Sequence, residues 1–157
     1  MLFRSNTPPT ESWFDATNWS LGTEPGATND VVVNNGNTTT IDNPDISATA
    51  SNVFISNDST VRIGDTITGT LVVEDTISVG TDNTGGTLEL NGGELHFNTL
   101  IIGTSGTYTD TNRFTIVLIG DAPTIRVAVD KAVTIESEIT GTDGLVADGL
   151  EIGRAHV

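Results

Sequence analysis

Short apolar segments of three to five residues recur throughout the chain, and each is bounded by Gly, Asn, Asp or Thr. Segments of this length, rich in Val, Ile and Leu, predict short β-strands separated by turns. Thr, at 27 of 157 residues, favours the same extended backbone as Val and Ile. We therefore expect an all-β protein. The predicted strands cover residues 31–33, 53–55, 61–63, 71–73, 77–79, 88–90, 95–97, 100–102, 114–118, 125–129 and 133–135.

Three of these segments open in a similar way and suggest a repeat: Asn52–Ile55, Thr70–Val73 and Thr99–Ile102. They are offset by 18 and then 29 residues, and the mean offset lies in the roughly 20 to 50 residues typical of solenoids. In a parallel β-helix each strand bonds to the coils above and below, so it needs no hairpin partner next in sequence. A β-sandwich is the alternative, but the hairpin signal Asn-Gly occurs only at Asn35-Gly36 and Asn91-Gly92, and most links lack it. We favour the solenoid.

Acidic side chains outnumber basic ones by 21 to 6, which gives a formal net charge of -15 at pH 7. A phosphate backbone would be repelled by this charge and would find few Lys or Arg, so the composition excludes nucleic acid as a partner. Anionic membrane surfaces are excluded for the same reason. No apolar run approaches the roughly 18 residues of a transmembrane helix, and we expect no membrane insertion by this segment. The chain has no Cys, which excludes disulfides and thiolate metal sites.

The chain divides into three regions that differ in composition and in repeat pattern. Residues 1–30 hold both Trp side chains and do not repeat, and we expect them to form an N-terminal aromatic capping segment. Residues 31–150 carry the predicted β-helical repeats. Residues 151–157 break this pattern, and their reverse translation resembles a common short-read sequencing adapter. We expect this last stretch to be an artefactual tail, so that the repeat region is truncated and the natural protein continues beyond about Gly149.

Two segments resemble known bacterial surface proteins. Trp13–Gly22, followed by Asp30–Val33, resembles the stretch that opens β-helical regions in such proteins. Near the other end, Val133–Leu145 is similar to the autotransporter-associated β-strand repeat. Asp143 replaces a Gly of that repeat, and Ala147-Asp148 stand where Lys-Thr is usual. Together the two segments, 13–33 and 133–145, cover about a fifth of the chain.

This resemblance implies the passenger of an autotransporter-type protein. Such a passenger is threaded through an outer-membrane barrel belonging to the same natural chain and folds outside as a right-handed parallel β-helix. The implied location is extracellular, at the cell surface or secreted, and the implied role is a non-catalytic stalk or adhesin that meets glycans or other host or cell-surface ligands. Two alternatives stay open: part of a carbohydrate-active β-helix that binds or degrades polysaccharide, and a trimeric β-structure like a tail fibre.

The two Trp residues suggest the one candidate binding site. Trp13 and Trp19, with Asp15 between them, could form a platform on which a sugar ring stacks. The competing interpretation is that the indoles seal the open apolar end of the first coil, since terminal repeats of solenoids need capping. We favour the seal because both Trp residues lie in the non-repetitive stretch before the solenoid begins.

A catalytic site on a β-helix would need clustered carboxylates with a basic residue or calcium nearby. With 21 acids along the chain, close pairs are expected by chance, and we assign them to turns and solvated strand faces. His96 is isolated between apolar residues, and His156 lies in the expected tail. The few basic residues are scattered, and we expect them to pair locally with acids. We therefore predict no catalytic residue, no metal site and no cofactor. The acidic positions considered are Asp42 with Asp45, Glu74 with Asp75, Asp82, and Glu136 with Glu138.

Overall fold

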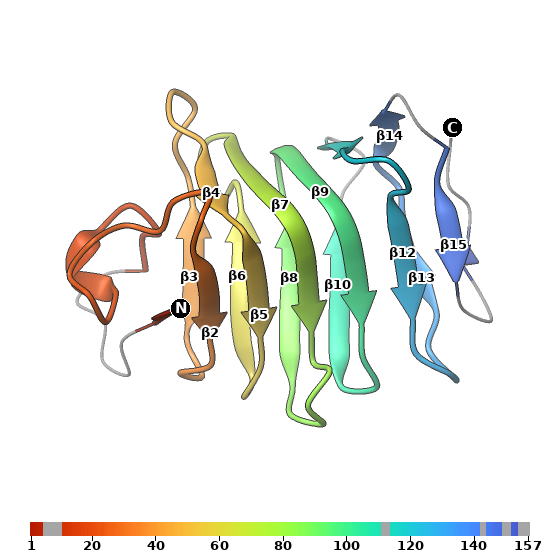
Figure 1. The fold of residues 1–157 in the computed structure, drawn as a ribbon, viewed down its shortest axis with the longest axis horizontal. Coiled ribbons are helices and arrows are strands. Elements are labelled where there is room, and N and C mark those ends of the chain that lie inside the picture. Colours follow the sequence, from red (N-terminus) through yellow and green to blue (C-terminus); the bar gives the residue numbers. More distant parts are fainter. Residues whose placement is uncertain (5–10, 111–113, 142–143, 149–151, 154–157) are drawn as a thin grey trace.

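The computed structural model describes residues 1–4, 11–110, 114–141, 144–148 and 152–153. These residues form a right-handed parallel β-helix of about five turns, which confirms the predicted fold class. Figure 1 shows the strands side by side along the long axis, with the N-terminus at one end and the C-terminus at the other. Every ladder between the described strands is parallel, so the β-sandwich alternative is wrong.

Each full coil contributes a strand to three faces. A 10-stranded sheet bends to supply two of them, and a 4-stranded sheet supplies the third. Face 1 contains β1 (Leu2–Phe3), β2 (Asp30–Val33), β5 (Asn52–Ile55), the second halves of β7 (Gly69–Val79) and β9 (Gly93–Ile102), β12 (Thr124–Val127) and β15 (Val146–Asp148). Face 2 contains β3 (Thr38–Ile41), β6 (Ser59–Ile63), β8 (Gly86–Leu90) and β10 (Gly106–Asp110). Face 3 contains β4 (Ala48–Ala50), the first halves of β7 and β9, β11 (Phe114–Leu118) and β14 (Glu138–Gly141).

Three short elements complete the described chain. The 3-10 helix η1 (Ala16–Asn18) lies in the N-terminal segment. β13 (Val133–Thr134) pairs with β16 (Ile152–Gly153). Apart from these two β16 residues, the expected artefactual tail lies outside the described residues. No helix in the part of the chain that the structure describes is long and apolar enough to cross a membrane.

The repeat length differs from the one that the sequence comparison suggests. On face 1 the aligned residues are Val31, Val53, Ile77, Leu100 and Ile125, which gives steps of 22, 24, 23 and 25 residues. The offsets of 18 and 29 arise because that comparison sets a face 3 segment, 70–73, against two face 1 segments. The alignment of the three segments predicted from the sequence is therefore wrong in register. The solenoid it indicates is correct because all three segments point alternate apolar side chains inward.

Two predicted strand pairs are each one continuous strand. β7 joins the predicted strands 71–73 and 77–79, and β9 joins 95–97 and 100–102. The ladder between them shifts register between Val73 and Thr76, where the chain turns from face 3 to face 1. The polar residues Glu74 and Asp75 at this corner suggest that the strand ends here. β7 nevertheless continues through the corner, where the N–H of Asp75 donates to the carbonyl oxygen of Ser51 in the preceding coil at 2.9 Å.

The core is a stack of aliphatic columns. Val53, Ile77 and Leu100 are aligned in successive coils and none of them is exposed. On face 3 the equivalent column runs through Leu71 and Leu95. Alternate residues of the central strands are buried, and those between them face outward. Burying an aliphatic side chain contributes about 1.5–3 kcal/mol, so each added coil stabilises its neighbour.

Candidate functional site

The aromatic segment lies over the first coil of the solenoid. The backbone N–H of Trp13 donates to the carbonyl oxygen of Thr40 at 2.8 Å, and the N–H of Thr40 donates to Glu11 at 2.7 Å. Residues 11–13 therefore extend face 2 beyond β3. At the same end, β1 extends face 1 by pairing with β2. On faces 1 and 2, the strand edges that the first coil would otherwise expose are thus covered by the chain's own N-terminal residues.

The two indoles pack against each other inside this segment. Trp13 is 1% exposed and Trp19 is 3% exposed. Their ring centroids are 5.0 Å apart in an edge-to-face arrangement with an interplanar angle of 67°. The Trp19 indole Nε1–H donates to the backbone carbonyl of Trp13 at 2.8 Å. Such an aromatic pair contributes about 0.5–1.5 kcal/mol beyond the area that it buries.

Arg4 packs against this pair, and Asp15 caps the short helix η1 between the two Trp residues. The guanidinium of Arg4 lies 5.4 Å from the centre of the Trp19 ring, and its Nε donates to Thr39 Oγ1 at 2.8 Å. Desolvation by burial lowers the pKa of Arg4 to about 10, although the nearby acids Asp15 and Glu11 act to raise it, so the side chain is charged at pH 7. Asp15 caps η1 by accepting from the Thr17 N–H at 3.0 Å.

These contacts correct the sugar-platform interpretation of Trp13, Asp15 and Trp19. A stacking platform needs an indole face open to solvent, whereas both indoles are covered by the protein. Asp15 uses one carboxylate oxygen, Oδ1, to accept from both the N–H and the hydroxyl of Thr17. The structure does bring the three residues together, and their arrangement is that of a cover over the first coil.

The outer surface of face 2 presents two regular columns of polar side chains. The residues of one column are aligned across four successive coils and are all threonines: Thr38, Thr60, Thr87 and Thr107. The second column lies two residues along each strand and contains Thr40, Arg62, Glu89 and Thr109. The side chains of both columns are half-buried or exposed. Neighbouring members of a column are one strand spacing apart, about 4.8 Å.

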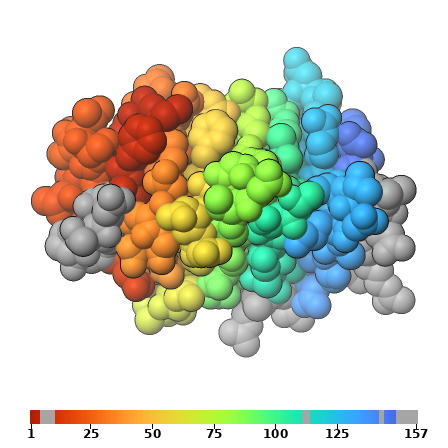
Figure 2. All heavy atoms as spheres, turned by 90° about the horizontal axis from the view of Figure 1, so that it is seen from below, coloured from red at the N-terminus to blue at the C-terminus, as the bar shows by residue number. Residues whose placement is uncertain are grey.

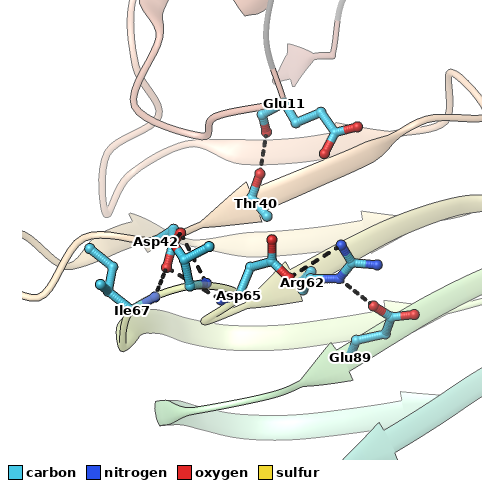
Figure 3. Close-up of polar contacts among 8 residues, drawn as sticks. Glu11, Thr40, Asp42, Arg62, Asp65, Ile67 and Glu89 are labelled. Carbon is cyan, nitrogen blue, oxygen red and sulfur yellow. Dashed lines mark hydrogen bonds and ion pairs between the residues drawn. The ribbon is translucent and has the colours of Figure 1, made fainter.

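Arg62 is the positive centre of the second column. Its Nε lies 2.6 Å from Glu89 Oε2 and its Nη1 lies 3.7 Å from Asp65 Oδ1 (Figure 3). The hydrogen bond to Glu89 raises the pKa of Arg62, and burial only partly offsets this effect. The pair therefore links two coils side to side. Arg126 and Asp148 make a similar link at 3.0 Å, as expected for basic residues that pair locally.

Asp42 forms hydrogen bonds to residues 65–67 at the corner of the following coil. Its carboxylate accepts from the N–H groups of Asp65 and Ile67 and from the hydroxyl of Thr66, the last at 2.8 Å (Figure 3). Burial acts to raise the pKa of Asp42, but these hydrogen bonds outweigh it and hold the pKa below the ordinary value. Its charge is therefore used in holding the fold together.

Two other carboxylates, Asp82 and Glu94, make local contacts on the outer surface. Asp82 accepts from the hydroxyl of Thr84 at 2.7 Å, and this hydrogen bond lowers its pKa. Glu94 meets His96 at 2.9 Å on the outer surface of face 3. Within residues 1–4, 11–110, 114–141, 144–148 and 152–153, no group of three His, Cys, Asp or Glu side chains could hold a metal ion.

Thr-rich outward faces that pair across coils are expected from the sequence, but the residues of the two columns on face 2 were not identified from it. A Thr-x-Thr pattern occurs at Thr38 to Thr40 and again at Thr107 to Thr109, and it is the signal that could have revealed them. Gly-Thr at 86–87 and Ser-Thr at 59–60 complete the series once the coil length of about 23 residues is known.

No known protein family, curated protein or solved structure matches this chain.

Proposed function

We propose that this chain is part of a non-catalytic extracellular passenger of an autotransporter-type bacterial surface protein, and that it acts as a stalk with an adhesive face. The observation that carries the proposal is the pair of polar columns on face 2. Four threonines stand at the same position in four successive coils beside Thr40, Arg62, Glu89 and Thr109. A rigid surface that repeats one hydroxyl per coil suits the binding of an extended, repetitive ligand.

The solenoid also suits export and folding outside the cell. Each coil contacts only its neighbours, so folding can begin at one coil and continue along the chain as it emerges through an outer-membrane barrel. The chain has no Cys, so no premature disulfide can trap it on the way. The net charge of -15 limits association between copies on a crowded surface.

Adhesion by face 2 can be tested with coated beads. Beads that carry the 157-residue chain should attach to bacterial cells or to extracellular-matrix glycoproteins more than beads that carry albumin. The double variant Thr60→Ala, Thr87→Ala should attach less, because it removes two adjacent hydroxyls of the column. The matched control is Thr70→Ala, Thr115→Ala, which removes two outward threonines from face 3. Equal loss in both variants, or no attachment by the unaltered chain, would contradict an adhesive face 2.

The alternatives give different results in two further assays. We expect no fragments when the chain is incubated with acidic and neutral polysaccharides, and cleavage would favour a carbohydrate-active β-helix. We expect a monomer by light scattering, because the aliphatic columns of the described residues close within one chain. An obligate trimer would favour the structure like a tail fibre.

A further inference from the structure

The loops that lead from face 1 to face 2 differ in length from coil to coil. After β7 the loop covers residues 80–85, after β9 it covers only 103–105, and after β12 it covers 128–132. A short turn therefore lies between two longer loops. Figure 2 views this edge of the molecule from below, with the yellow-green loop after β7 and the blue loop after β12 on either side of the green turn between them.

A groove of about 660 Å³ lies over this short turn. Its floor contains Ile101, Ile102 and Gly103, and one wall is formed by Val127 and Val129. Val129 is 67% exposed, a large value for an apolar side chain beside a groove. The volume lies in the range of ligand sites, which also combine apolar lining with a few placed polar groups.

The opposite wall contains Thr81 and Asn83 of the loop after β7, and hydrogen bonds of neighbouring residues fix that loop. Thr84 Oγ1 donates to Asp82 at 2.7 Å and accepts from the N–H of Asn57 at 2.8 Å. Thr104 Oγ1 donates to Asn83 Oδ1 at 3.3 Å and so joins the loop to the short turn. Asn83 has a φ of 65°, a conformation that Asn tolerates better than most residues. A wall held in this way loses little conformational freedom when a ligand binds.

Gly103 makes the floor of the groove possible. A Cβ at this position would collide with the backbone of Gly80 and Thr81 in the preceding coil. The short turn can therefore lie close against the neighbouring loop only with glycine here, and the floor stays below the two walls.

The rim carries a balanced pair of charges. Arg126 Nε lies 3.0 Å from Asp148 Oδ2, and the side chains are 56% and 61% exposed. The guanidinium has further N–H donors and the carboxylate has further acceptor sites that can bind hydroxyl groups. Together with the amide of Asn83, they surround an apolar floor with donors and acceptors.

We propose that this groove binds an uncharged saccharide. A pyranose ring has an apolar C–H face that fits against Ile101 and Val129, and its hydroxyls fit the Asn83, Arg126 and Asp148 groups. The charge of the protein opposes an anionic ligand, while the balanced rim gives no preference for a cationic one. The inference rests on the proposed adhesive function and supplies a ligand class and a second position for it, apart from face 2.

The first experiment is a glycan array probed with the 157-residue chain. The array should hold neutral oligosaccharides of glucose, galactose, mannose and N-acetylglucosamine beside uronic-acid and sialylated ones. We expect binding among the neutral members. Absence of any saccharide binding, or a preference for acidic members, would overturn the proposal.

Variants then place the binding on the molecule. Arg126→Ala and Val129→Asp should each weaken calorimetric binding of the best neutral oligosaccharide by about tenfold or more, since they remove a charged donor and an apolar wall. The control Ile46→Asp puts the same charge at another exposed apolar position, 57% exposed and outside the groove, and should bind normally. Unaltered binding by both groove variants would overturn the proposal.

Two further readouts separate folding and face 2 from the groove. Circular dichroism reports whether each variant is folded, and NMR shifts of residues 81–83, 103–104 and 126–129 on saccharide addition locate the site even if one variant fails to fold. Bead attachment that persists in Arg126→Ala while Thr60→Ala, Thr87→Ala abolishes it would refute the groove as the adhesive site and leave the function of face 2 intact.

Discussion

Changing Trp19 to Ala should open the N-terminal end of the solenoid. The change removes the edge-to-face contact with Trp13 at 5.0 Å and the hydrogen bond from Nε1 to the Trp13 carbonyl. It also removes the ring beneath the buried guanidinium of Arg4. Three contacts that hold the cover together are therefore lost by one substitution.

The resulting loss of unfolding free energy can be estimated from similar substitutions. Replacing a buried Trp by Ala costs about 3–5 kcal/mol, and a cation–π contact at a desolvated site contributes up to about 2 kcal/mol. In a solenoid the effect falls on the coil that the residue contacts, because each coil is stabilised by its neighbours. We therefore expect the cover and first coil to unfold well before the central coils.

The chain allows this to be measured directly, because both of its Trp residues lie in the cover. Tryptophan fluorescence in urea reports the cover, whereas far-UV circular dichroism reports all the coils. With a urea dependence of about 2 kcal/mol per molar, a loss of 3–5 kcal/mol lowers the fluorescence midpoint by about 2 M. The circular dichroism midpoint should fall by much less.

Trp19→Phe is the matched control. It keeps a ring near Trp13 and Arg4 but loses the Nε1 donor, so a loss of about 1 kcal/mol is expected from the hydrogen bond. The reasoning is refuted if Trp19→Ala leaves the fluorescence midpoint unchanged. It is also refuted if the folded variant loses saccharide binding that the unaltered chain shows, because the indoles would then belong to a binding site.

Three further predictions concern the coils themselves. Leu95→Ala removes a fully buried side chain from a central coil and should cost about 2–5 kcal/mol in urea unfolding, with both spectroscopic probes affected. Gly93→Val should prevent folding, as judged by loss of the β-sheet dichroism signal, because Gly93 has a φ of 118° and its Cβ would collide with the backbone of Gly69, whereas Gly92→Ala, which meets no atom within 4 Å, should fold. The pKa of Asp42 is lower in the folded state, so its contribution to stability is complete above the unfolded value of 3.8 and is lost as the pH falls through the folded value. Asp42→Asn should therefore lower the free energy of unfolding at pH 7. In urea titrations from about pH 7 to about pH 2, the variant should also lose less of this free energy as the pH falls.

Much of the fold was predictable because inward positions carry a strong signal. The strand 114–118 has the predicted bounds, and Val31–Val33 and Val53–Ile55 lie within β2 and β5. In each of them, apolar residues at i and i+2 point into the core. Such local alternation can be recognised without knowing which coils are adjacent.

The missed strands lack this signal. In β3 an inward position is filled by Thr39, which is fully buried and accepts a hydrogen bond from Arg4. In β10 the inward residues are Gly106, Tyr108 and Asp110. The buried hydroxyl of Tyr108 donates to Asp110. Desolvation by burial is the larger cause that raises the pKa of Tyr108, and the nearby Asp110 carboxylate is the smaller one. Contacts made by residues far apart in the sequence decide these strands, so a local pattern does not reveal them.

The candidate site was predicted in part. Trp13, Asp15 and Trp19 lie close together in the sequence, but a spacing of six residues does not determine whether the indoles face solvent or the first coil. The groove could not be predicted from the sequence, for a different reason. It depends on a difference in length between loops of adjacent coils, and the coil boundaries become clear only from the ladder registers.

The parallel ladders also determine how the molecule responds to force. Their hydrogen bonds run along the long axis, and β1 and β15 lie towards opposite ends of it (Figure 1). Tension between the ends therefore pulls on the coil-to-coil bonds in series, and the coils detach one at a time from an end. Each released coil of about 23 residues lengthens the tether by about 75 Å. A chain with this fold therefore lengthens under tension in discrete steps while its other coils stay folded.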